Sequence, residues 1–292
     1  GAARRLTLMS DPRTIHIGHS PDPDDAFMFH ALTTGVLDTP GFRFQHVLLD
    51  IESLNHAALK GTYEVSAISI HSYPDVAADY ALMNCGASMG EGYGPMVVAR
   101  PGTSLDSARN SSIAIPGLKT SAHLALKLAW GAVEVTEVSF DEIIPRGKAG
   151  EFVRGVIIHE GQLTYGEHGL ECLLDLGIWW QERTGGLPLP LGGNIIRRDL
   201  GTELMEQFTD WVARSIEHSL AYPKEALEFA RQWGRGIDEQ TNSRFVQMYV
   251  NQRTLDYGPD GRDSVRRFLR EGQKAGMVDE QFEIDEIVFV GA

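Results

Sequence analysis

The chain has few cysteines, no long apolar run and a shortage of basic residues. Its two cysteines, Cys85 and Cys172, form neither a Cys-X-X-Cys pair nor a Cys-His ligand spacing, so the sequence predicts no structural metal site. So few cysteines are typical of a reducing compartment, with a single disulfide as the alternative. No apolar run approaches the ~20 residues that span a bilayer. Residues 1–11 lack the apolar core of a secretory signal, and we therefore expect a cytoplasmic protein.

Acidic residues outnumber basic ones, 40 to 26, which gives a net charge of −14. Nucleic acids and anionic membranes are bound through clustered Lys and Arg, so the sequence favours neither as a partner. A hydrophobic content of 42% is that of a globular protein, and 292 residues are enough for two domains. We expect a monomer or homodimer that binds a small molecule.

Strand-like and helical segments alternate along most of the chain, which predicts an α/β fold with parallel sheets. The first predicted strands are 14–18, 43–49 and 65–70, with helices at 26–37 and 52–60. The pattern returns with strands at 112–115, 135–140 and 155–158 and helices at 121–130 and 141–150. Helices dominate residues 202–275, divided at Pro223, Gly234, Gly236 and Gly258, and residues 284–290 add a last strand or apolar edge.

Two segments rich in glycine and proline, residues 92–100 and 185–193, predict crossings between two lobes. Two crossings make the first lobe discontinuous, formed by residues 14–97 and 192–292. They insert a second lobe, residues 98–191, into the first. A ligand then binds in the cleft between the lobes, where hinge closure covers it.

A buried strand is predicted to end in a histidine. Val156, Ile157 and Ile158 form a short β-branched run, and His159, Glu160 and Gly161 follow it directly. This places His159 at the carboxyl end of a strand, where open α/β sheets bind ligands. Histidine is also the side chain best suited to proton transfer near neutral pH. The alternative is a core or turn histidine without a chemical role.

The segment Ser20-Pro21-Asp22-Pro23-Asp24-Asp25 follows the first predicted strand and opens a helix. Its prolines stiffen the loop, as a ligand site requires. We expect Ser20 and Asp24 to contact the substrate. In the alternative interpretation Asp24 or Asp25 only caps the helix, and a site for a hard cation is a weaker possibility because the spacing matches no known cation loop.

A second loop, residues 116–122, lies between a predicted strand and helix and contains Lys119, Thr120 and Ser121. Free amides at a helix start attract anions, and the two hydroxyls and the lysine would add donors. The loop lacks the order of a phosphate-binding P-loop. We therefore predict a pocket for the carboxylate of a small molecule, against the alternative of an ordinary helix cap. Ser69 and His71, at the end of another strand, are further candidate donors, although packing is the favoured role of His71.

Together these segments resemble the 1,4-dihydroxy-6-naphthoate synthase family of menaquinone biosynthesis, over about residues 15–257. The family's opening motif, roughly SPCPNDTF, corresponds to Ser20-Pro21-Asp22-Pro23-Asp24-Asp25-Ala26-Phe27, and its IIHE motif to Ile157-Ile158-His159-Glu160. Further matching segments are Leu163-Thr164-Tyr165, Asp175-Leu176-Gly177, Trp179-Trp180, Glu182-Arg183-Thr184 and Leu187-Pro188-Leu189-Pro190-Leu191-Gly192. The segments are specific jointly, and none suffices alone.

The resemblance implies a two-lobed, periplasmic-binding-protein-like fold of type II, used as an enzyme. It implies a carbon–carbon lyase that needs no cofactor and cleaves cyclic dehypoxanthine futalosine to 1,4-dihydroxy-6-naphthoate and dihydroxyacetone. The family's proton acceptor corresponds to His159. Its substrate-binding stretches correspond to Ala67, Ile68, Ser69, Thr120 and Ser121.

The chain departs from the family pattern in its first motif and at position 67. Asp22 and Asp24 replace a Cys and an Asn, and Ala67 replaces a frequent lysine. Losing a cation while gaining acids weakens the hold on an anionic substrate. Two other functions fit the same fold: chorismate dehydratase, which the IIHE segment disfavours, and a non-catalytic solute-binding protein, which the missing signal segment disfavours.

Overall fold

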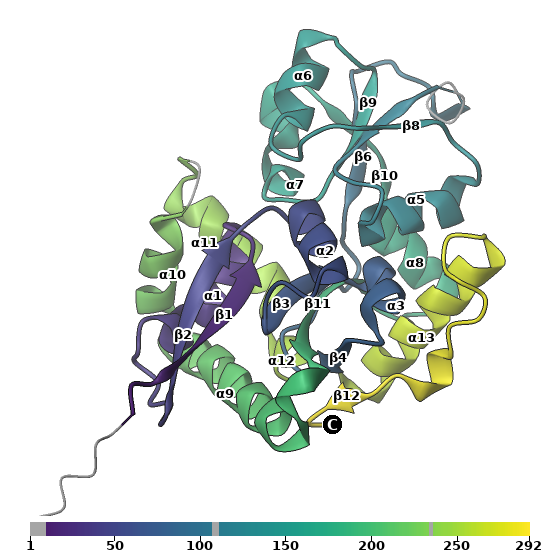
Figure 1. Cartoon of the computed structure of the whole chain (residues 1–292). Coiled ribbons are helices and arrows are strands. Elements are labelled where there is room, and N and C mark those ends of the chain that lie inside the picture. The colour runs from purple at the N-terminus through teal and green to yellow at the C-terminus, as the bar shows by residue number, and fades with distance from the viewer. Residues whose placement is uncertain (1–9, 107–110, 234–235) are drawn as a thin grey trace, which may run out of the picture.

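The computed structural model describes residues 10–106, 111–233 and 236–292. Its described strands form two sheets (Figure 1). The first sheet contains β1 (Arg13–His19), β2 (Phe42–Leu48), β3 (Val65–Ser69), β4 (Tyr80–Met83), β5 (Ser88–Gly90), β11 (Leu189–Arg197) and β12 (Phe289–Val290). The second contains β6 (Met96–Ala99), β7 (Ile113–Ile115), β8 (Val135–Glu137), β9 (Arg154–Ile157) and β10 (Glu171–Asp175).

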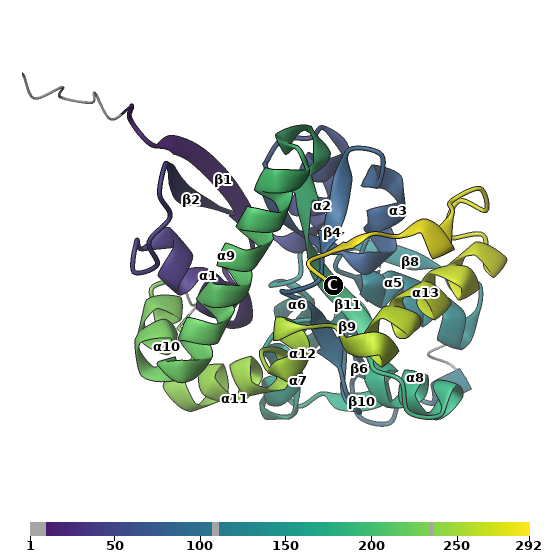
Figure 2. The same ribbon diagram turned by 90° about the horizontal axis from the view of Figure 1, so that it is seen from below.

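Helices surround both sheets (Figures 1 and 2). The early helices are α1 (Pro23–Thr33), α2 (Ile51–Leu59), α3 (Tyr73–Val76), α5 (Ser121–Trp130), α6 (Ile143–Ala149), α7 (Gly161–Thr164) and α8 (Leu176–Thr184). The late helices are α9 (Thr202–Ala221), α10 (Pro223–Arg231), α11 (Glu239–Tyr249), α12 (Gln252–Leu255) and α13 (Gly258–Lys274). Short 3₁₀ turns lie at Ile70–Ser72, Tyr165–His168, Arg198–Leu200 and Ile284–Glu286. No described helix is both long enough and apolar enough to cross a bilayer.

The two-lobed fold is confirmed, but the expectation of purely parallel sheets is wrong. The strand order is β12-β4-β11-β3-β1-β2 in the first sheet, with β5 beside β11, and β10-β6-β9-β7-β8 in the second. β1 is parallel to β2 and β3, whereas β11 runs antiparallel to β3 and β4. In the second sheet β7 is parallel to β8 and β9, and β6 is antiparallel to β9 and β10. The antiparallel strands arise because the predicted crossings are themselves strands: β6 lies in residues 92–100, and much of β11 lies in residues 185–193.

The strands of the second sheet all lie between β5 and β11 in the sequence, as an inserted lobe requires. The lobe boundaries themselves, residues 14–97 with 192–292 and residues 98–191, stay a prediction. Of the predicted helix breaks, Pro223 and Gly258 each begin a helix, Gly236 lies between α10 and α11, and Gly234 lies outside the described residues. The last expected strand is β12, which pairs with β4 at the edge of the first sheet.

The helix predicted at 121–130 coincides with α5. The first helix, predicted from residue 26, begins earlier, at Pro23. Proline suits the first helical position because its fixed φ matches the helix and its missing N–H needs no partner there. Sequence periodicity did not predict β4, β5, β10, α7 or α8, since each spans fewer than ten residues and carries little pattern.

Trp180 joins the inserted lobe to the C-terminal helices. It is completely buried, and its indole N–H donates to the Pro188 carbonyl at 3.1 Å and to the Ser264 hydroxyl at 3.0 Å. Its ring meets that of Phe268 edge-on, with centroids 5.4 Å apart. The side chain therefore packs α8 against α13.

We predict that Trp180→Ala destabilises the protein by about 3–5 kcal/mol, because it removes a large buried side chain and, with it, the indole N–H that donates to Pro188 and Ser264. Urea denaturation followed by circular dichroism measures this loss. The matched control is Trp179→Ala, since Trp179 is only partly buried and should cost clearly less. Equal losses for the two variants would show that Trp180 does not join the lobes.

Candidate active site

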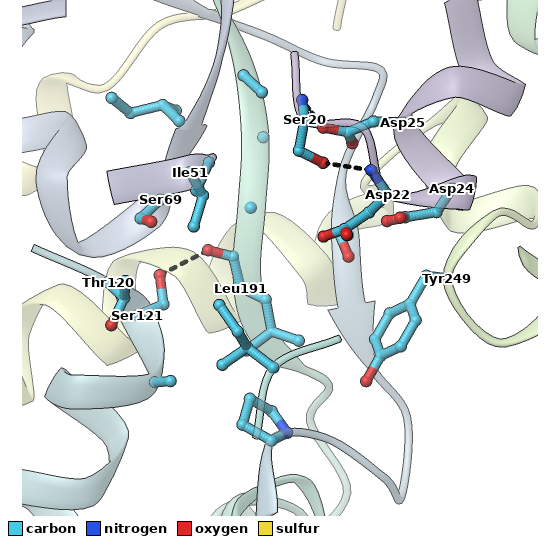
Figure 3. A pocket seen from close by; sticks show the side chains of 18 of the residues that line it. Ser20, Asp22, Asp24, Asp25, Ile51, Ser69, Thr120, Ser121, Leu191 and Tyr249 are labelled. Atoms are coloured by element: carbon cyan, nitrogen blue, oxygen red, sulfur yellow. Dashed lines mark hydrogen bonds between the residues drawn. The ribbon is translucent and has the colours of Figure 1, made fainter. Parts of the chain in front are cut away.

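A cavity lies where elements of the two sheets meet. The first sheet contributes the loop from β1 to α1, the end of β3, and β11. The second contributes the start of α5 and Ile158, which directly follows β9, and α11 closes the cavity at one side. Figure 3 shows the acidic loop and the start of α5 on opposite sides of the cavity.

The structure brings all the predicted substrate contacts to this one cavity. Its wall includes Ser20, Asp24, Ala67, Ile68, Ser69, Thr120 and Ser121. His159 is not part of the wall, although its neighbour Ile158 is. The departures from the family pattern, Asp22, Asp24 and Ala67, also lie on the wall.

The acidic loop is organised around Ser20. The Ser20 N–H donates to Asp25 Oδ2 at 2.8 Å, and the Asp22 N–H donates to the Ser20 hydroxyl at 3.3 Å. Because α1 begins at Pro23, Asp22 is its cap residue and Asp24 and Asp25 lie in its first turn. The alternative interpretation, in which Asp24 or Asp25 is the cap residue, is therefore wrong. The positive end of the helix dipole favours acids in this turn.

Burial raises the pKa of Asp24 well above the ordinary carboxyl value, and the negative charges of Asp25 and Asp22 raise it further. The pKa of Asp25 is also raised by burial, opposed by its hydrogen bonds with Ser20. The described residues that line the cavity include no Lys, Arg or His. The described part of the chain holds no group of three or more His, Cys, Asp or Glu placed to bind a metal.

Ser69 is oriented by a residue that the sequence did not single out. The buried Asn55 side chain donates to the Ser69 hydroxyl oxygen at 2.9 Å and accepts the Ser69 N–H at 2.9 Å. With one lone pair of the hydroxyl occupied by Asn55, its proton is available for a ligand. Asn55 lies on α2 at a position without motif, so only the fold relates it to Ser69.

At the start of α5 the donors differ from those expected. The Thr120 hydroxyl donates to the Gly117 carbonyl at 2.7 Å, and the Ser121 hydroxyl donates to the Leu191 carbonyl at 2.5 Å. The Lys119 ammonium lies 3.4 Å from Asp75 and is not part of the cavity wall. The remaining donors are the N–H groups of Ser121 and Ala122, which have no hydrogen-bond partner within the described residues.

His159 follows β9, as predicted, and is buried. Its Nδ1 accepts the Gly161 N–H at 2.9 Å, and its Nε2 lies 3.0 Å from the Phe140 carbonyl. A carbonyl only accepts, so the proton is on Nε2 and the basic lone pair is on Nδ1. Gly161 permits this arrangement, because a Cβ there would lie 2.5 Å from the His159 ring. Both ring nitrogens are thus engaged by the main chain.

The cavity is also lined by residues that the sequence did not single out as substrate contacts: Tyr249, Phe245 and the β11 residues Leu191, Gly192 and Gly193. Leu191 and Gly192 lie in a segment that matches the family, and that match was their one available signal. Tyr249 and Phe245 lie in a helical region without a motif.

Three other aromatic side chains lie outside the cavity wall. Tyr93 and Tyr165 line a separate depression, and Trp180 is in the core. His71 is buried, with Nδ1 3.0 Å from the Thr120 carbonyl and Nε2 3.1 Å from the Met277 carbonyl, so packing is its role.

Comparison with known proteins relates most of the chain to one family. The family described as menaquinone biosynthesis matches residues 15–274. A 1,4-dihydroxy-6-naphthoate synthase of Thermus thermophilus is 40% identical over 90% of this chain and 95% of its own length. The enzyme of the same name from Streptomyces coelicolor is 33% identical over 91% of this chain and 95% of its own.

Solved structures agree with this relation. The crystal structure of a protein from Archaeoglobus fulgidus is 42% identical, with a TM-score of 0.87, and the match covers 92% of this chain and all of that one. The alkanesulfonate-binding protein of Xanthomonas axonopodis matches with a TM-score of 0.70 at 12% identity, over 96% of this chain and 99% of its own. The second likeness shows the periplasmic-binding-protein fold alone. The family model matches residues 15–274, and the two named relatives are 40% and 33% identical to the chain. The chain therefore belongs to the menaquinone biosynthesis family.

Proposed function

We propose that the chain is a carbon–carbon lyase that forms 1,4-dihydroxy-6-naphthoate from cyclic dehypoxanthine futalosine and releases dihydroxyacetone. The observation that carries this proposal is the 40% identity, over 90% of the chain, to an enzyme named for that product. The cavity supports it, because the substrate contacts expected from the family meet in one place. Aromatisation of the released naphthoate supplies much of the driving force.

The start of α5 is the site proposed for the substrate carboxylate. The Ser121 and Ala122 N–H groups and the helix dipole together favour an anion there. The Thr120 and Ser121 side chains contribute by holding the turn, since their hydroxyl protons are bound to main-chain carbonyls. Ser69, with its proton available beside Ala67 and Ile68, adds a side-chain donor.

His159 is the proposed proton acceptor. The Nδ1 lone pair is the basic site of its ring and is occupied by the Gly161 N–H. To accept a substrate proton, the ring exchanges this main-chain hydrogen bond for one to the substrate. Ile158 already lies on the cavity wall, so a turn of the adjacent side chain brings the ring to the substrate. Closure of the lobes on the ligand would drive that turn.

Chorismate dehydration and transport without catalysis are less well supported. Both named relatives carry the naphthoate synthase name, and the solute-binding proteins share only 10–14% identity with this chain. We further propose a cytoplasmic location, a monomer or homodimer, and the lobe boundaries given above.

The direct test is incubation of the purified protein with cyclic dehypoxanthine futalosine and chromatographic detection of the naphthoate. We expect equal amounts of naphthoate and dihydroxyacetone without any added cofactor. Conversion of chorismate in its place, or tight binding of the futalosine without turnover, would contradict the proposal.

For the proton acceptor, we predict that His159→Asn lowers kcat by about 10²–10⁴-fold, which is the usual contribution of general-base catalysis. Substrate affinity should change little, because His159 lies behind the cavity wall. Steady-state kinetics measure both quantities, and His168→Asn, a substitution at an exposed histidine, serves as the control. Turnover by His159→Asn within a few-fold of wild type would make His159 a structural residue.

For the carboxylate site, we predict that Thr120→Leu raises KM by about ten-fold or more, because it distorts the turn that presents the α5 amides and charge-assisted hydrogen bonds are strong. The same substitution at Thr136 of β8, an exposed residue that is not part of the cavity wall, is the control. An unchanged KM for Thr120→Leu would show that the start of α5 does not bind the substrate carboxylate.

A further inference from the structure

A buried hydrogen bond joins α11 to α7, the short helix that follows His159. The Tyr249 hydroxyl donates to Gln162 Oε1 at 2.7 Å, and both residues are buried. Burial raises the pKa of the Tyr249 phenol well above its ordinary value, so the hydroxyl keeps its proton and remains a donor. A buried polar group that loses its partner is unfavourable. The bond therefore favours one position of α7 relative to α11.

The helix that carries Tyr249 is held by the core of the molecule. Val246 and Val250 belong to a hydrophobic cluster that also contains Ile15 of β1 and Phe27 of α1. On another face of the same helix, Phe245 and Tyr249 lie one turn apart and both line the cavity. The position of α11 is thus set by core packing and does not depend on α7.

The helix that carries Gln162 has much less support of its own. α7 spans only Gly161–Thr164, and so short a helix is not stable by itself. Gly161 and Gln162 are its buried residues, and glycine has no side chain. Gln162 therefore provides the only buried side chain of α7, and the place of this helix depends on the partner that Gln162 finds.

The first turn of α7 holds His159 at two points. The Gln162 N–H donates to the His159 carbonyl at 2.9 Å, and the Gly161 N–H donates to His159 Nδ1 at 2.9 Å. The first bond fixes the main chain of the histidine, and the second fixes its ring. A displacement of α7 would therefore move both together.

The two partners face different spaces. Tyr249 lies on the cavity wall, and Figure 3 shows its hydroxyl directed away from the acidic loop. Gln162 is not part of the cavity wall and instead lines the separate depression beside Tyr93 and Tyr165. The hydrogen bond thus lies between the cavity and the depression, and its acceptor does not face the substrate.

We propose that Tyr249 and Gln162 are positioning residues whose hydrogen bond fixes α7 and, through α7, the distance of the His159 ring from the substrate. The inference rests on the proposed function, since it takes His159 to be the proton acceptor. The bond stays intact while the histidine ring exchanges the Gly161 N–H for the substrate. Neither Tyr249 nor Gln162 takes or gives the transferred proton.

The test is a double-mutant cycle of Tyr249→Phe and Gln162→Met. Phenylalanine keeps the ring on the cavity wall, and methionine keeps nearly the length of glutamine without its amide. Each single variant should lower kcat by about ten- to a hundred-fold, because a small displacement of a catalytic group has effects of this size. KM should change little, since the start of α5 is untouched. The double variant should be no slower than the slower single variant, because both substitutions remove one shared interaction.

The matched control is Tyr93→Phe. The Tyr93 hydroxyl donates to the Met248 carbonyl, so this variant also removes a hydrogen bond to α11, but one that does not involve α7. Its kcat should stay near that of the wild type. Circular dichroism shows whether each variant is folded. If Tyr249→Phe does not fold, Gln162→Met is compared with Tyr93→Phe alone, with the same expected loss of kcat.

Hydrogen–deuterium exchange tests the positioning without turnover. The Gly161 and Gln162 N–H groups are both bonded to His159, so they should exchange slowly in the wild type. Tyr249→Phe and Gln162→Met should each speed exchange in peptides that cover α7 and leave exchange in α11 unchanged. Tyr93→Phe should leave exchange in α7 at the wild-type rate.

Four results would overturn the inference. The first is a kcat of Gln162→Met within a few-fold of wild type, and the second is an equal loss for Tyr93→Phe. The third is a pair of losses that add in the double variant, or a Tyr249→Phe variant that raises KM alone, since Tyr249 would then contact the substrate itself. The fourth is unchanged exchange in α7. If the wild-type enzyme does not cleave the futalosine, the proposed function is wrong, and the exchange comparison still decides whether the bond positions α7 and His159.

Discussion

A buried hydrogen bond connects the lobes beside the cavity, and the position of the proposed proton acceptor depends on it. The Tyr249 hydroxyl of α11 donates to Gln162 Oε1 of α7 at 2.7 Å. Both side chains are 3% exposed, so neither can exchange its partner for water without a free-energy cost. The Gln162 N–H also donates to the His159 carbonyl at 2.9 Å. Contact between the C-terminal helices and the inserted lobe therefore holds the segment that carries His159.

The same lobe contact defines a cavity with two chemically different ends. At one end the start of α5 offers main-chain amides, and at the other the loop before α1 offers carboxyl groups. A lysine at position 67 would provide a cation for an acidic substrate, but Ala67 does not. The described residues of the wall include no Lys, Arg or His, so the main-chain amides at the start of α5 are the donors suited to an anion.

Much of the fold was predictable, because local signals mark the strands and helices that surround the cavity. Ser121–Trp130 forms the expected helix, and the carboxyl ends of β1, β3 and β9 carry the expected loops. The antiparallel direction of β6 and β11 was not predictable, since strand direction is set by pairing with distant strands. Short elements such as α7 were not predicted for a different reason. Four residues are too few to show the periodicity of a helix.

The sequence by itself determined which residues could take part: the acidic loop, the start of α5 and the strand ending at His159 are all local patterns. The tertiary structure decided how each one takes part. It placed Asp24 among like charges in a buried wall, bound the Thr120 and Ser121 hydroxyls to carbonyls, and engaged both nitrogens of His159 with the main chain. These outcomes depend on burial and on partners from distant segments, because desolvation and hydrogen-bond competition exist only once the chain has folded.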